Sequence, residues 1–127
     1  METEDGLFVP VLRDAGRRSA ADLATEFDAL RAAVRGRTVA PERLRGQTIT
    51  LSNFGAIAGI HAAMVVVPPQ VAIVGAGRAA PRVVAGAAGP VVHRVLPLSI
   101  TIDHRVITGV EACRFLAALI ADLEQSQ

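Results

Sequence analysis

Near the carboxyl end of this 127-residue chain a strand-like pattern is followed, after a short junction, by a helix-like one. This change in the spacing of apolar residues most constrains the fold. Residues Val95–Ile102 end in alternating polar and apolar side chains, which is typical of a half-buried strand. Seven residues later the apolar period becomes helical and predicts a helix at Gly109–Gln125. One side of that helix carries Val110, Cys113, Leu116, Ala117 and Ile120.

A second helix is expected after Ser19, which lies three residues before the acidic Asp22, a pattern typical of a helix start. Gly36 is a suitable carboxyl-terminal cap for this helix. Its apolar side repeats at spacings of 4, 3 and 4 through Leu23, Phe27, Leu30 and Val34. The chain therefore offers two amphipathic helices.

Short apolar or alternating runs predict several further strands. They lie at Leu7–Leu12, Gln47–Ser52, Met64–Val67 and Val71–Val74, with a hairpin formed by Arg82–Ala85 and Val91–Arg94. Phe54–His61 is rich in glycine and predicts a loop, and Pro41 is expected to open one helical turn through Leu44. This order predicts an α+β fold with a mixed β-sheet and helices on one face.

Charge and cysteine content exclude several classes of protein. The 13 basic and 12 acidic residues are interspersed and give a net charge of +1, so no basic face for nucleic acid is expected. The single cysteine permits no internal disulfide, which agrees with a reducing cytoplasm. The amino terminus has no secretory pattern, and the most apolar run, Ala62–Ala76, is too short to span a membrane. We therefore expect a cytoplasmic protein without a nucleic-acid or membrane partner.

Three features suggest chemistry that their context does not support. Residues Gly75–Ala80 fit the dinucleotide-binding pattern G-x-G-x-x-G/A, but a proline and a Val-Val strand follow where that site needs a helix. His61, His93 and His104 are far apart in sequence, so no metal site is expected. Cys113 is expected on the core side of the last helix, as a packing residue rather than a nucleophile.

His104 and Ser52 stand at the ends of expected strands. His104 lies at a strand-to-helix junction, where a side chain is held rigidly and still reaches a cleft. Ser52 precedes Asn53-Phe54-Gly55, and by itself it is expected to bond the turn backbone. A lone histidine is more often a satisfied structural side chain than a catalytic one, so the residues alone leave both interpretations open.

Four segments match the motifs of one enzyme family, in the family's order. SITIDHRVITG, which begins at Ser99, is similar to D-H-R-x-x-D-G, and ETEDGLFVPVLRDAG to D-T-x-x-G-L-x-V-P-V-I-R-[DN]. LRGQTITLSNFGAIAG is similar to G-x-x-F-T-I-S-N-x-G, and VVPPQVAIVGAGR to N-x-P-[EQ]-x-A-I-L-x-V-G. The chain thus resembles the dihydrolipoamide acyltransferases, the core enzymes of 2-oxo acid dehydrogenase complexes.

The resemblance implies the fold of chloramphenicol acetyltransferase, with a mixed sheet and helices on one face. The family's catalytic domain is much longer, so residues 1–127 are expected to be its C-terminal half and a fragment of a larger protein. The chain contains no lysine. Because the family carries lipoate on a lysine amide, the lipoyl group is expected on a separate lipoyl domain.

The implied reaction is acyl transfer between dihydrolipoamide and coenzyme A as substrate. The resemblance makes His104 the base that takes the coenzyme A thiol proton, and Ser52 the donor to the oxyanion of the tetrahedral intermediate. Ser52, Asn53 and Gly77 are expected at coenzyme A, and Thr108 is counted with the catalytic residues. The family builds this site between subunits of a homotrimer, and its other partners are the lipoyl domain and the dehydrogenase components.

The chain departs from these motifs at Thr108, where the family has Asp or Asn, and also at Glu2 and Val67. Threonine keeps a hydroxyl but carries no charge. Two other functions therefore stay open: a noncatalytic oligomerisation or assembly core, and an acetyltransferase that uses a soluble acceptor. The acyl group is left open between acetyl, succinyl and branched-chain groups. The assembly is left open between a trimer, a cubic core and an icosahedral core.

Overall fold

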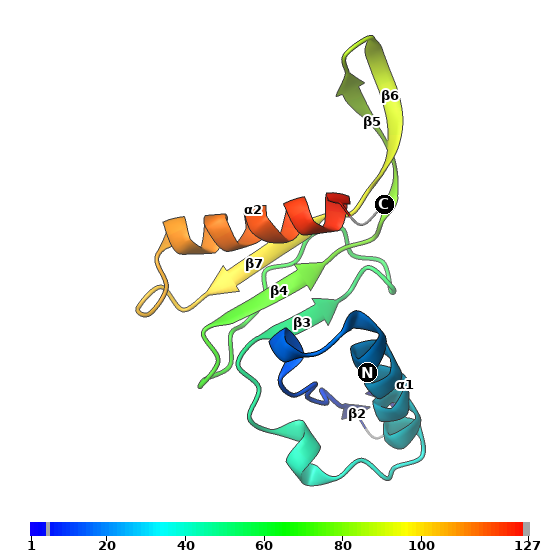
Figure 1. The fold of residues 1–127 in the computed structure, drawn as a ribbon, viewed down its shortest axis with the longest axis vertical. Helices are drawn as coiled ribbons and strands as arrows, with labels where there is room; N and C mark the ends of the chain where they lie inside the picture. The colour runs from blue at the N-terminus through cyan, green and yellow to red at the C-terminus, as the bar shows by residue number, and fades with distance from the viewer. Residues whose placement is uncertain (5, 126–127) are drawn as a thin grey trace. The chain divides into compact units, whose positions relative to one another are not determined.

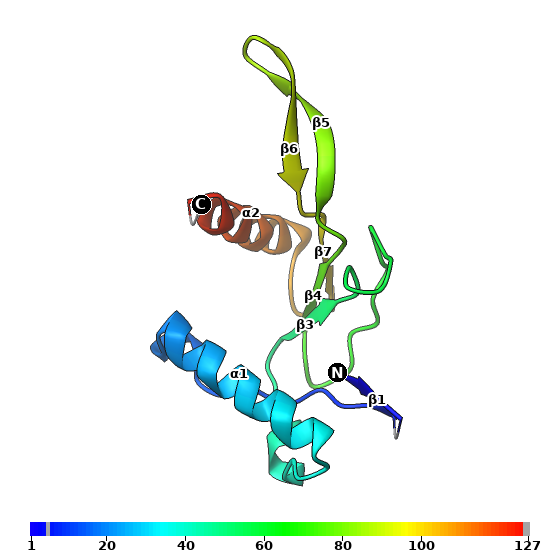
Figure 2. The same cartoon turned by 90° about the vertical axis from the view of Figure 1, so that its right-hand side faces the viewer.

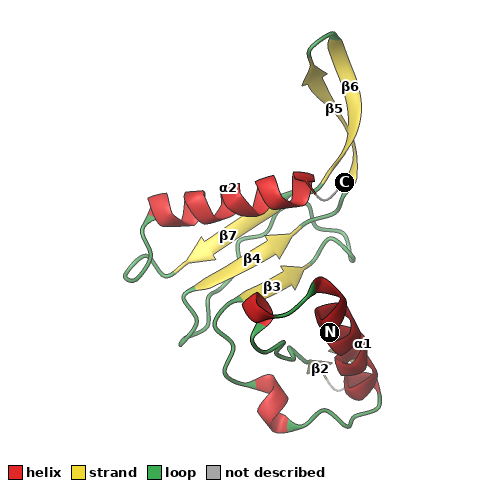
Figure 3. Ribbon diagram, viewed as in Figure 1, coloured by secondary structure: helices red, strands yellow, loops and turns green. Residues whose placement is uncertain are grey.

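The computed structural model describes residues 1–4 and 6–125 and divides into two compact units, Met1–Gln47 and Thr48–Gln127 (Figure 1). The first unit contains β1 (Glu2–Thr3), β2 (Gly6–Leu7), α1 (Ala20–Arg35) and two 3₁₀ turns, Ala15–Arg17 and Pro41–Leu44. The second contains β3 (Thr50–Asn53), β4 (Ala72–Ala76), β5 (Ala80–Gly86), β6 (Gly89–Val95), β7 (Leu98–Ile102) and α2 (Gly109–Gln125). Helices and strands are thus mixed along the chain, as the sequence predicted (Figure 3). Among the described residues, no helix has the length and apolar character needed to cross a membrane.

The limits of α1 follow from its two caps, and both predicted caps are confirmed. The Ser19 hydroxyl oxygen accepts from the Asp22 amide at 3.1 Å, and the hydroxyl donates to the Asp22 carboxylate at 2.6 Å. At the other end the Gly36 amide closes the last turn. Of the predicted apolar side, Leu30 and Val34 are buried and form much of the core of the first unit.

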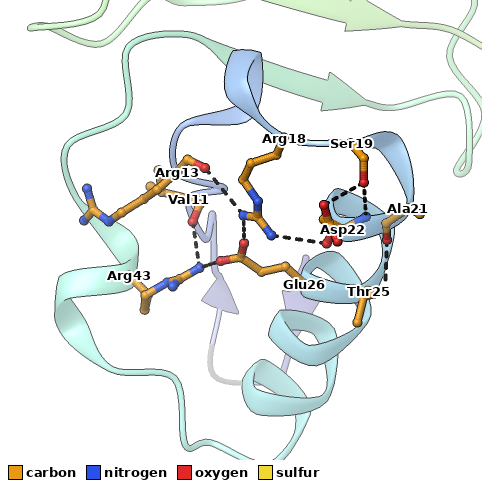
Figure 4. A network of polar contacts seen from close by, with 9 residues as sticks. All are labelled: Val11, Arg13, Arg18, Ser19, Ala21, Asp22, Thr25, Glu26 and Arg43. Atoms are coloured by element: carbon orange, nitrogen blue, oxygen red, sulfur yellow. Dashed lines mark hydrogen bonds and ion pairs between the residues drawn. The ribbon is translucent and has the colours of Figure 1, made fainter.

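A carboxylate on α1 joins three segments of the first unit. Figure 4 shows Glu26 between the guanidinium groups of Arg18, which precedes α1, and Arg43, in the second 3₁₀ turn. Arg43 also donates to the Val11 carbonyl at 3.2 Å, and the Val11 amide donates to the Arg43 carbonyl at 2.7 Å. These bonds hold the extended segment around Val11, the helix and the turn together.

The second unit is built on a three-stranded mixed sheet of order β3-β4-β7. β3 and β4 are parallel, and β4 and β7 are antiparallel. α2 lies beside β7 (Figures 1 and 2), and its buried Ala112 lies over the face that carries Ile100 and Ile102. A mixed sheet with a helix on one face is confirmed for this unit.

The predicted hairpin is confirmed as β5 and β6, which pair from Ala80 with Val95 to Gly86 with Gly89. In the described part of the chain these two strands pair only with each other. Figures 1 and 2 show the ribbon projecting away from the three-stranded sheet. Val83 and Val92 face each other across it and are about 70% exposed, at 71% and 68%.

Two strand predictions were wrong. At Leu7–Leu12 only Leu7 is in a strand, because the Val11 amide and carbonyl bond Arg43 instead of a neighbouring strand. Met64–Val67 alternates in exposure like a strand but forms no strand, and Pro68 follows it with no amide hydrogen to donate. Its Met64 packs by its sulfur against Gly75 of β4 instead.

Cys113 is exposed, which corrects the expectation that it faces the core. α2 is apolar on more than one side, and the side toward the sheet carries Ala112, with Leu116 and Leu119 half-buried. Of the predicted side only Leu116 is half-buried, and Val110 is 60% exposed. The period alone did not show which apolar side meets the sheet.

Candidate functional site

His104 lies in the turn that joins β7 to α2, as the sequence predicted. The Val106 and Ile107 amides both donate to the Asp103 carbonyl at 3.0 Å, which closes this turn. The His104 side chain is exposed, and its Nε2 lies 3.9 Å from the place a β-carbon on Gly109 would take. The imidazole therefore stands in solvent beside the first residue of α2.

The Asp103 carboxylate fixes the beginning of the turn. Its Oδ1 accepts from the Arg105 amide at 3.1 Å, and its two oxygens accept from the Arg105 guanidinium at 2.6–3.2 Å. Although Arg105 is mostly exposed, the Asp103 side chain is only 19% exposed. These hydrogen bonds to Arg105 lower the pKa of Asp103 to about 2.

A titration of Asp103 should show this lowered pKa. Since the folded pKa lies below the ordinary value of 3.8, the stabilisation is present above pH 4 and is lost as the pH falls toward 2. We expect the carboxyl ¹³C resonance of Asp103 to titrate with a midpoint near 2. Replacing Arg105 by glutamine should return the midpoint toward 3.8, and a wild-type midpoint already at 3.8 would contradict the ion pair.

Thr108 forms the amino-terminal cap of α2 together with Glu111. The Thr108 amide donates to Glu111 Oε2 at 2.8 Å and the Thr108 hydroxyl donates to the same oxygen at 2.7 Å. In return the Glu111 amide donates to the Thr108 hydroxyl oxygen at 3.3 Å. This reciprocal pattern is a capping box, and the hydrogen bonds from Thr108 lower the pKa of Glu111.

Sequence reasoning missed Glu111, although the signal was present. The spacing Thr-x-x-Glu at residues 108–111, directly before an apolar helical run, is the pattern of a capping box. Thr108 is expected among the catalytic residues, at a position where the family has Asp or Asn, and its pairing with Glu111 is not among the sequence-based predictions. In the structure Thr108 caps the amino terminus of α2, and its hydroxyl donates to Glu111.

Ser52 and Asn53 end β3, the parallel neighbour of β4. Ser52 is half-buried and pairs in register with Gly75, whereas Asn53 is exposed and pairs with Ala76. Both side chains thus stand at the carboxyl end of a strand, where the chain turns into the glycine-rich loop predicted after it.

Gly77 holds that loop against the end of β4 by close backbone contact. Its amide donates to the Pro97 carbonyl at 2.9 Å, and the next amide, of Arg78, donates to the Gly59 carbonyl at 2.8 Å. A β-carbon on Gly77 would lie 2.2 Å from the Ile60 carbonyl oxygen. The described contacts of Gly77 are therefore those of a packing residue beside the loop that follows Ser52.

Replacing Gly77 by alanine is expected to lower the free energy of unfolding by about 3 kcal/mol, because the backbone must move to admit a methyl group. Gly16→Ala is the matched control, since no heavy atom lies within 4 Å of its β-carbon position. Urea denaturation of the full-length variants measures both. Equal stability of the two variants would contradict the close approach at Gly77.

Ser52 and His104 do not meet within one chain. Ser52 is in register with Gly75, and Gly75 with Ser99, so all three lie at one level of the sheet. β7 ends at Ile102, three residues after Ser99, so at the rise of a strand the turn that carries His104 begins about 10 Å further along the sheet. A hydrogen-bond network between one serine and one histidine requires a second copy to bring them together.

The other candidates from the sequence are the dinucleotide-binding pattern, His61 and His93. Residues Gly75–Ala80 run from the end of β4 into the start of β5 and open no helix, which agrees with rejecting the dinucleotide-binding interpretation. His61 and His93 are exposed. Within residues 1–4 and 6–125, no three His, Cys, Asp or Glu side chains gather as metal ligands do.

A largely apolar cavity of about 340 Å³ lies between α2 and the sheet of the second unit. Ile100 and Ile102 line it from β7, and Ala112 and Phe115 line it from α2. Glu111 is also at its wall. An open, largely apolar groove thus runs between the first turns of α2 and the sheet.

Known proteins resemble this chain over its whole length. The model of the family described as 2-oxoacid dehydrogenases acyltransferase (catalytic domain) matches residues 1–127. The lipoamide acyltransferase component of the branched-chain alpha-keto acid dehydrogenase complex of Pseudomonas putida is 42% identical over 122 residues, which cover 96% of this chain and 29% of that protein.

Two solved structures share the fold. The cubic core of the pyruvate dehydrogenase multienzyme complex superimposes with a TM-score of 0.86 at 35% identity, over 92% of this chain and 48% of that one. The dihydrolipoamide acetyltransferase of Azotobacter vinelandii gives 0.87 at 35% identity, over 93% and 49%. The chain spans about a quarter of the length of the curated relatives that it matches, and about half of these solved chains.

The A. vinelandii structure was used to investigate one serine, one histidine and one asparagine in the catalytic mechanism of that enzyme. There the histidine follows the serine by 52 residues and precedes the asparagine by 4. In this chain His104 follows Ser52 by the same 52 residues, and Thr108 follows His104 by the same 4. The three positions selected from the sequence therefore reproduce that spacing, with threonine in place of asparagine.

Proposed function

The chain belongs to the 2-oxoacid dehydrogenase acyltransferase family, and from this premise we propose that its full-length protein transfers an acyl group between dihydrolipoamide and coenzyme A. The observation that carries the proposal is the spacing of Ser52, His104 and residue 108, which equals that of the serine, histidine and asparagine investigated in the A. vinelandii enzyme. The residues also stand at element ends, where side chains reach solvent.

In the proposed reaction, the His104 imidazole takes the proton of the coenzyme A thiol. A thiol has a pKa of about 8.5 and is mostly protonated at neutral pH, so a base is required. The thiolate sulfur attacks the thioester carbonyl carbon of acyl-dihydrolipoamide, and Ser52 donates a hydrogen bond to the resulting oxyanion. Collapse breaks the bond to the dihydrolipoamide sulfur, which receives the proton from His104.

The site is proposed to form between two copies of the chain, in a homotrimer that builds a larger core. The sheet register supports this arrangement, because one chain holds Ser52 and His104 far apart. The projecting β5–β6 ribbon also supports it, because an isolated two-stranded ribbon with exposed valines is only marginally stable alone. The lipoyl group arrives on a separate domain, and the dehydrogenase components complete the assembly.

The proposal is tested by assaying the full-length protein with dihydrolipoamide and separate acetyl, succinyl and branched-chain acyl-coenzyme A donors. Acyl-dihydrolipoamide should form with at least one of them. A protein that assembles into the core but transfers none of these acyl groups would instead support a noncatalytic assembly function. The pattern of accepted donors also identifies the acyl group.

A further inference from the structure

The turn that carries His104 is fixed at both ends by carboxylates. Asp103 binds the Arg105 amide at the end next to β7, and Glu111 binds the Thr108 amide and hydroxyl at the end next to α2. His104 lies between these two anchors. The position of its imidazole therefore depends on both of them.

The anchor at Glu111 also decides where α2 begins. Thr108 is the last residue before the helix, and its carbonyl accepts the first helical bond, from the Ala112 amide at 3.1 Å. The imidazole of His104 stands next to Gly109, the first helical residue. A shift of this helix start would move the surface beside which the imidazole lies.

Packing alone holds this end of α2 weakly. The groove of about 340 Å³ is lined by Glu111, Ala112 and Phe115, so this side of the first turns of the helix is only partly covered by the sheet. Among the side chains of α2, Ala112 is the buried one. The capping hydrogen bonds between Thr108 and Glu111 therefore contribute substantially to fixing the turn.

We infer that Glu111 is a positioning residue, which holds Thr108 and thereby the imidazole of His104 in its working place. This inference rests on the proposed function. Threonine is a weaker helix cap than asparagine, and its hydroxyl hydrogen needs an acceptor. The A. vinelandii enzyme has asparagine at the same distance from its histidine, whereas this chain has Thr108 paired with Glu111.

The test compares two glutamates of one helix in the full-length protein. Glu111→Ala is expected to lower kcat about tenfold with KM unchanged, since the base is misplaced while the substrate sites remain. Glu111→Gln should stay within about threefold of wild type, because glutamine also completes a capping box. Glu124→Ala removes the same charge from the exposed last turn of α2 and should leave kcat within about twofold.

A different helix cap, introduced by Thr108→Asn, distinguishes the positioning role of Glu111 from any other effect of its removal. Asparagine at residue 108 caps the helix by its own side chain, so Glu111→Ala should cost little in the Thr108→Asn background. The inference is overturned if Glu111→Ala lowers kcat no more than Glu124→Ala does. It is equally overturned if the loss is undiminished when Thr108 is asparagine.

A readout without catalysis keeps this inference separate from the proposed function. In Glu111→Ala the Thr108 amide should lose protection from hydrogen exchange, and the imidazole ¹H–¹⁵N resonances of His104 should shift. Neither change is expected in Glu124→Ala. If wild type transfers no acyl group but Glu111→Ala shows both changes, the proposed function fails and the positioning stands. Unchanged His104 resonances would refute the positioning whatever the activity.

Discussion

Replacing His104 by alanine is expected to lower kcat for acyl transfer by about 100- to 10,000-fold, which is the usual contribution of a general base. The physical reason is that the attacking thiol, which is that of dihydrolipoamide when acyl-coenzyme A is the donor, is mostly protonated at neutral pH and supplies little thiolate. The side chain is exposed and no bond from its imidazole closes the turn, which is held by the Asp103 carbonyl and carboxylate. The variant should therefore fold normally. Steady-state kinetics with dihydrolipoamide and an acyl-coenzyme A measure the loss.

His93→Ala is the matched control for this variant. His93 is also exposed, lies in β6 opposite Arg82, and belongs to no part of the proposed site. Its removal should leave kcat within about twofold of wild type. If His104→Ala keeps the wild-type rate, or if the two variants lose activity equally, the assignment of His104 as the base is wrong.

Replacing Ser52 by alanine is expected to lower kcat by about 100- to 1,000-fold, the cost of removing one donor to an oxyanion. Because the hydrogen bond strengthens only as charge develops in the transition state, KM should change little. Ser99→Ala is the matched control, since Ser99 is a half-buried strand serine at the same level of the sheet. A loss that appears in KM alone would place Ser52 in substrate binding rather than in stabilisation of the oxyanion.

Much of the second unit could be predicted from the sequence because its signals are local. The limits of α2 are those of the apolar helical period, and the β5–β6 hairpin lies at the turn Ala87-Ala88 between its glycines. Sequence patterns gave wrong predictions where the structure of a segment depends on which other segment packs or pairs with it. Met64–Val67 has the alternation of a strand but pairs with no other strand in the described part of the chain, and Cys113 is exposed on a side of α2 from which only Leu116 is half-buried.

The candidate site shows the same division. The junction that holds His104 was evident from the change of hydrophobic period, and the family motifs pointed to Ser52. The spacing Thr-x-x-Glu is compatible with a pairing of Thr108 and Glu111. The reciprocal hydrogen bonds of the structure establish that pairing. The separation of Ser52 from His104 depends on strand register across three strands, which no local pattern contains.

The central claim is that one catalytic site takes Ser52 from one copy and His104 from another. Its most direct test is to co-assemble the Ser52→Ala and His104→Ala full-length variants in equal amounts and measure acyl transfer. Each variant is nearly inactive alone, but a random mixture should place both intact residues together in about a quarter of the sites. Recovery to about a quarter of wild-type activity is the predicted result. Activity no greater than that of the separate variants, in oligomers shown to contain both chains, would contradict the shared site.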